Sequence, residues 1–165
     1  MKKKIVTSVG FLLCVLVIFF IGYNNLKSHN SNTNPEVIAN NMVWLTITRV
    51  SESLSNATTS TKVNKDELSR LLILYSSQSA EFTKLVGEDM MPIMQSGRAT
   101  SDFLTRASVD GMDKEEFQRL VQISSNFAAM TEQYAVLYHK QTGEMNYQAR
   151  DQIMNLNATI MNLIR

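Results

Sequence analysis

Residues 113–138 read DKEEFQRLVQISSNFAAMTEQYAVLY and carry the clearest structural pattern of the 165-residue chain. Their apolar side chains recur at steps of three and four, which places them on one face of an α-helix. Asp113 can cap the first turn, and Glu116 follows at the spacing of a capping box. The stretch therefore predicts an amphipathic helix that begins at Asp113 and ends at Gly143. Such a helix must bury its apolar face against other elements.

Two more amphipathic helices are predicted upstream. The first begins at residues 34–36 (Asn-Pro-Glu), since Asn caps well, Pro fits the first helical position and Glu favours the positive helix end. Its apolar face consists of Val43, Ile47, Val50, Leu54 and Ala57, widened by Met42, Trp44 and Leu45. The second helix begins at Asn64, has Glu67 at the capping-box spacing, and ends at Gly87.

The remaining segments complete a helical domain. Residues 88–109 are the least regular because Pro92 interrupts them, and we expect a break near Gly87 followed by a new helix. The last helix has an apolar seam at Ala149, Ile153, Leu156, Ile160 and Leu163. Two prolines and six glycines are few for this length, and no alternating pattern indicates a strand. The predicted fold is all-α, an up-and-down bundle of four or five helices over residues 35–165.

An apolar stretch precedes this domain. Residues 5–23 read IVTSVGFLLCVLVIFFIGY, 19 residues without a charge, directly after Lys2, Lys3 and Lys4. A helix of this length spans about 28 Å, close to the ~30 Å hydrocarbon core of a bilayer. Lysines stay on the cytoplasmic side. The sequence thus predicts a basic cytoplasmic start (1–4), a transmembrane anchor (5–23), a polar tether (24–34) and an extracytoplasmic bundle.

Two other interpretations of this stretch remain open. A cleaved secretory signal has an apolar core of about 7–15 residues and a small-x-small cleavage site, and this stretch has a longer core and no good site. A lipid-modified Cys14 would need a small residue just before it, where Phe11-Leu12-Leu13 stand. An uncleaved anchor accounts for the residues better than either alternative.

Composition narrows the class of protein. Cys14 is the only cysteine, so the outer domain has no internal disulfide, which favours a bacterial cell surface. Beyond the three lysines, 13 basic and 15 acidic side chains remain. This balance does not suggest a nucleic-acid partner, which would require a basic face.

A run of methionines is the most unusual local feature. Met90, Met91 and Met94 surround Pro92. Thioether sulfurs suit Cu(I), but no His or Cys accompanies them. Methionine also fills cores and lines adaptable contact surfaces. Contact, core and copper binding stay open, and we favour contact because irregular segments often carry binding.

Signals for catalysis are lacking. The outer domain has no cysteine and only two histidines, His29 in the tether and His139 near the end of the fourth predicted helix. No nucleophile elbow, His-Glu-x-x-His motif or phosphate loop occurs. Residues 110–117 resemble part of a calcium loop, but with Gly111 at its sixth position the first and twelfth positions would be Arg106 and Phe117, where such a loop needs carboxylates. We therefore expect no enzyme, no cofactor and no metal.

Two functions fit these features. The first is a membrane-anchored interaction module, an accessory or assembly protein that contacts another protein or a second copy of itself. Its expected contact residues are Met90, Met91, Met94, Ile153, Leu156, Ile160 and Leu163, since an exposed apolar stripe marks a partner surface. The second is an extracytoplasmic ligand-sensing domain, because the layout resembles the sensing part of bacterial chemoreceptors. No second span follows before Arg165, so we do not expect a direct transducer.

We expect the chain to stay in the membrane fraction with its bulk outside, because residues 5–23 are uncharged and follow three lysines. Fractionation of cells, with protease added to intact cells, measures both properties. A soluble product that begins near Asn24 would instead identify a cleaved signal.

Overall fold

The structure is a computed structural model that describes residues 34–59, 65–87, 93–110 and 112–165, and only the backbone of residues 93, 94 and 108–110. These ranges form α2 (Pro35–Thr59), α3 (Lys65–Val86), α4 (Ile93–Asp110), α5 (Lys114–Ala135) and α6 (Tyr147–Ile164). No β-strand occurs among the described residues, so the all-α class is confirmed for them.

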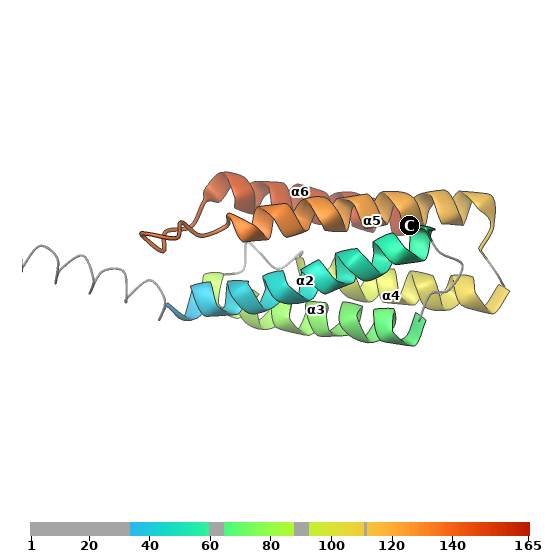
Figure 1. Cartoon of the computed structure of the whole chain (residues 1–165), viewed down its shortest axis with the longest axis horizontal. Helices are drawn as coiled ribbons and strands as arrows, with labels where there is room; N and C mark the ends of the chain where they lie inside the picture. The colour runs from blue at the N-terminus through green and yellow to red at the C-terminus, as the bar shows by residue number, and fades with distance from the viewer. Residues whose placement is uncertain (1–33, 60–64, 88–92, 111) are drawn as a thin grey trace, which may run out of the picture.

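The helices lie side by side in an elongated bundle (Figure 1). Helices α2, α4 and α6 run in one direction, and α3 and α5 run back. The end where α2, α4 and α6 begin is called the proximal end, and the opposite end is the distal end. Each helix packs on two others, and together the five form a closed ring. The order around the ring is α2, α3, α4, α6 and α5, and α5 packs on α2 again. Helix α4 thus packs on α3 and α6, although α5 follows it in the chain.

Aromatic side chains from α3 and α5 meet in the interior of this ring. The rings of Tyr75 and Phe127 meet edge to face with centroids 5.8 Å apart, and those of Phe82 and Tyr134 lie 6.5 Å apart. All four side chains are fully buried. Because α3 and α5 are not neighbours in the ring, these contacts cross its interior and connect its two sides.

Helix ends follow the local sequence signals. Asn34 Oδ1 accepts a hydrogen bond from the Glu36 amide at 3.0 Å, as expected for the start of α2. Asp113 and Glu116 form the predicted capping box of α5. The break at Gly87 is also confirmed, because α3 ends at Val86 and Gly87 has a φ of +105°, which glycine adopts without strain. Asn64 lies outside the described residues.

The predicted end of the fourth helix is wrong. Helix α5 ends at Ala135, and its last turn closes through hydrogen bonds from Val136 N to Gln133 O and from Leu137 N to Tyr134 O. Residues 136–146 then form a hairpin in which Tyr138 and Met145 make an antiparallel bridge. Leu137 and Tyr138 are buried although they lie outside any helix. No glycine or proline marks this end of α5, which explains the error.

The predicted membrane anchor is not part of the described structure. Residues 1–4, 5–23 and all of the tether except Asn34 lie outside the described ranges. Within those ranges, no helix combines the length and apolar character needed to cross a bilayer.

Gly97 sets the close packing of α4 on α3. A Cβ atom at this position would lie 2.6 Å from the carbonyl oxygen of Leu72 and 2.8 Å from Cδ1 of Tyr75. The first of these atoms belongs to the backbone of α3 and cannot rotate away. The two helices therefore approach so closely that only glycine fits at the crossing.

We expect Gly97→Ala to destabilise the bundle. Alanine favours helix over glycine by about 1 kcal/mol, but overpacking against a fixed backbone costs about 1–3 kcal/mol, and the overpacking should dominate. Urea unfolding followed by circular dichroism measures the change. Ser77→Ala on the exposed face of α3 is the control, expected within about 0.5 kcal/mol of wild type. A Gly97→Ala variant as stable as this control would contradict the close packing.

Candidate functional site

A groove at the proximal end is the best-formed candidate site. It encloses about 410 Å³, within the roughly 300–1,000 Å³ typical of small-molecule sites. Helix α2 contributes Val37, Asn40, Asn41 and Trp44, all from its first ten residues. The end of α5 and the hairpin contribute Ala135, Tyr138, His139 and Lys140. The groove thus forms where the start of α2 meets the segment that follows α5.

Two polar contacts hold these segments together. The side-chain amide nitrogen of Asn40 donates a hydrogen bond to the carbonyl oxygen of Tyr134 at 3.2 Å. The hydroxyl of Tyr138 donates to Glu36 Oε2 at 3.1 Å. Each contact joins residues more than 90 positions apart in the sequence. They fix the first two turns of α2 against the end of α5 and the hairpin.

Tyr138 is the most perturbed ionisable group beside the groove. Its side chain is buried, and its ring meets that of Phe82 edge to face at 6.4 Å. Burial raises the pKa of the phenol well above its usual value, and the neighbouring Glu36 carboxylate raises it further. Tyr138 therefore stays neutral and keeps donating its hydrogen bond across the whole physiological pH range.

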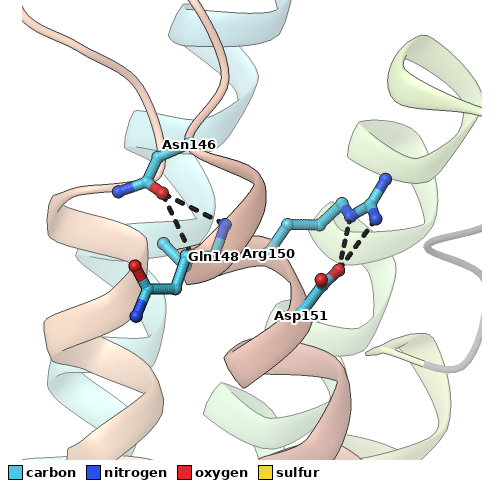
Figure 2. Close-up of polar contacts among 5 residues, drawn as sticks. Asn146, Gln148, Arg150 and Asp151 are labelled. Atoms are coloured by element: carbon cyan, nitrogen blue, oxygen red, sulfur yellow. Dashed lines mark hydrogen bonds and ion pairs between the residues drawn. The ribbon is translucent and has the colours of Figure 1, made fainter.

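A second hollow also borders the hairpin. It measures about 760 Å³, and Gly143 lines both hollows. Tyr147 and Arg150 from the start of α6 form part of its wall, with the guanidinium 5.0 Å from the centre of the tyrosine ring. Figure 2 shows that Arg150 also pairs with Asp151, with a shortest contact of 2.8 Å. Both of these contacts of Arg150 are thus with residues of its own helix, α6.

The hairpin enters α6 through a cap. Asn146 Oδ1 accepts hydrogen bonds from the backbone nitrogens of Gln148 and Ala149 at 3.1 and 3.3 Å (Figure 2). The capping residue satisfies two amides that have no partner within the helix. The start of α6 is thus fixed directly beside the hairpin that lines the candidate site.

The predicted contact surface of Met90, Met91 and Met94 stays a prediction. Met90 and Met91 lie outside the described residues. Met94 belongs to the first turn of α4, at the proximal end, but its side chain is not described. The choice among contact, core and copper binding for these methionines therefore stays a prediction.

The predicted seam of the last helix lies largely inside the bundle. Ile153 and Ile160 are fully buried, and Leu156 and Leu163 are partly buried against the same core. Helix α6 uses this seam to pack on α4 and α5, so Ile153 and Ile160 are core residues of the folded chain. Neither side chain is free to contact a partner of the folded bundle.

An apolar stripe on α2 faces solvent instead. Ile38, Met42 and Leu45 are 48%, 52% and 58% exposed. The prediction that Met42 and Leu45 belong to the buried face of α2 is wrong. Val43, Ile47 and Val50 already fill the face that packs on α3 and α5. We call Ile38, Met42 and Leu45 the α2 stripe.

A scan against protein-family models and searches of curated proteins and of solved structures found no match to this chain. Among the residues that the structure describes, no group of three or more His, Cys, Asp or Glu side chains is arranged to hold a metal ion.

We expect Tyr138→Phe to make the bundle less sensitive to alkaline pH. In the unfolded chain the phenol ionises near pH 10, whereas in the folded chain its raised pKa keeps it neutral, so wild-type stability falls as the pH rises above about 10. The variant should lose this part of the fall, and at neutral pH it should be destabilised by about 1–2 kcal/mol because the bond to Glu36 is missing.

Urea unfolding between about pH 8 and 11 measures both effects. Tyr147→Phe is the matched control, since it removes an exposed phenol beside the same hairpin. Equal pH dependence in the wild type and in Tyr138→Phe would contradict the role assigned to Tyr138.

Proposed function

We propose that the chain is a single-pass, membrane-anchored helical interaction module, an accessory or assembly protein at a bacterial cell surface. In this proposal residues 1–4 are cytoplasmic, residues 5–23 span the membrane, residues 24–34 are the tether and residues 35–165 form the extracytoplasmic bundle. The uncharged segment behind three lysines supports the anchor. The proposal includes no enzymatic activity.

The single observation that carries the interaction role is the α2 stripe. Ile38, Met42 and Leu45 follow the spacing i, i+4, i+7, so they lie along one outward face of α2. The same face continues through Arg49 and Glu52, which are exposed and charged. The apolar part is therefore confined to the half of α2 next to the tether.

This arrangement fits a contact surface better than a packing surface. The ring of five helices is already closed, and α2 buries its other face against α3 and α5. A contiguous exposed apolar stripe on a domain with a filled core indicates association with another molecule. Methionine at its centre suits an adaptable contact, because its unbranched side chain fits varied surfaces. The partner is another protein or a second copy of this chain.

Site-specific photo-crosslinking in intact cells tests the proposal. A photoreactive amino acid replaces Met42, and the same amino acid at Glu52 is the matched control, on the same face of α2 beyond the apolar part. We expect discrete crosslinked species from position 42, identified by mass spectrometry as one protein or as this chain, and none from position 52. Identical adducts at both positions, or none at either, would contradict the interaction role.

A second experiment separates a contact role from a structural one. Replacing Met42 and Leu45 together with Ser should leave the melting temperature nearly unchanged, because exposed substitutions usually change stability by no more than about 0.5 kcal/mol each. The crosslinks should nevertheless be lost when the photoreactive group is placed at Ile38. A large drop in melting temperature would show instead that the stripe is needed for folding.

A ligand-sensing domain is the second candidate function, and the groove at the proximal end favours it. The groove combines the rings of Trp44 and Tyr138 with side-chain amides and a lysine, and small-molecule sites commonly join aromatic walls to a few polar groups. Sensing and interaction are compatible, since a ligand at the base of α2 would lie on the same helix as the α2 stripe.

A further inference from the structure

The amide of Asn40 is only half satisfied. The residue is 4% exposed, and its nitrogen must face Tyr134, because the carbonyl oxygen of Tyr134 can only accept a hydrogen bond. The orientation of the amide is therefore fixed by chemistry. Its Oδ1 is buried and accepts no hydrogen bond from any described residue. Buried acceptors are nearly always paired, with an ordered water where no protein donor is near, so this oxygen has the capacity to accept one further hydrogen bond.

The groove above Asn40 supplies the rest of a binding site. Trp44 is half-buried, and its ring offers a flat apolar surface beside Val37. Asn41 is exposed and adds a second amide. Lys140 adds a positive charge, and no Asp or Glu occurs among the described residues that line the groove. The lining thus favours a ligand with a negative charge, an apolar face and a hydrogen-bond donor.

We propose that this groove binds a small organic acid that also carries an O–H or N–H donor. The carboxylate pairs with Lys140, the apolar face packs on Trp44, and the donor reaches Asn40 Oδ1 at the base of the groove. Neighbouring side chains cover this oxygen, so binding includes a rotamer change of the kind common at binding sites. Acidic sugars and free amino acids share this chemistry. The inference names the ligand class of the sensing function and does not depend on the membrane anchor or on the α2 stripe.

Fluorescence of the full chain in detergent micelles tests the proposal directly, because Trp44 is the only tryptophan. Sodium glucuronate represents the acidic sugars, leucine the amino acids, and glucose is the control without a carboxylate. We expect a saturable change in Trp44 emission below about 10 mM with glucuronate or with leucine, and none with glucose. The acid that binds identifies the source of the ligand.

Two variants link the signal to the groove. Lys140→Gln changes an exposed side chain and should weaken binding at least about tenfold, the effect of losing one well-placed charge contact. Lys114→Gln, an exposed lysine at the distal start of α5, is the matched control and should bind as the wild type does. Asn40→Leu removes the unpaired acceptor and should also weaken binding. If this buried variant does not fold, Lys140→Gln alone decides the question.

The proposal is overturned if neither acid gives a saturable change up to about 10 mM, if glucose binds as tightly as glucuronate, or if Lys140→Gln binds as well as Lys114→Gln. None of these outcomes bears on crosslinking from Met42, which does not line the groove. Failure of the ligand proposal can therefore be distinguished from failure of the interaction role.

Discussion

The aromatic contacts between α3 and α5 are the constraint on which the rest of the bundle depends. Five helices form a closed ring, and side chains from two helices that are not neighbours in this ring meet in its interior. Tyr75 and Phe82 on α3 meet Phe127 and Tyr134 on α5 across this space. Edge-to-face pairs of this kind contribute about 0.5–1.5 kcal/mol beyond the area that they bury. These aromatic pairs connect α3 and α5, which are not adjacent helices in the ring.

Filling the interior with tyrosine has consequences at the proximal end. The phenols of Tyr75 and Tyr134 are fully buried, and burial raises the pKa of both. Tyr134 lies in the last turn of α5, and the side-chain amide of Asn40 donates a hydrogen bond to its backbone carbonyl, which aligns α2 with α5. Tyr138 then extends the aromatic contacts into the hairpin through Phe82 and fixes Glu36. The groove at the start of α2 therefore forms between segments that the packing of these tyrosines holds in place.

Local sequence patterns predicted helix caps and helix ends, which depend on residues a few positions apart. They did not predict contacts between residues that are distant in the sequence. The capping box of Asp113 and the stop at Gly87 are local, and both are confirmed. Periodicity found the apolar seam of the last helix but could not tell that Ile153 and Ile160 pack on α4 and α5 of the same chain. Periodicity also placed Met42 on the buried face of α2, because the spacing of apolar residues does not show how wide the buried face is. The hydrogen bond from Tyr138 to Glu36 joins residues 102 positions apart, so no local sequence pattern predicts it.

Thermal unfolding of residues 34–165, produced without the preceding segment, tests most directly the claim that these helices form one self-contained domain. The account predicts a strongly helical circular dichroism spectrum, a single cooperative transition that coincides by circular dichroism and Trp44 fluorescence, and no change on adding a chelator. A gradual melt, transitions that differ between the two probes, or folding that requires residues 1–33 or a metal would contradict it.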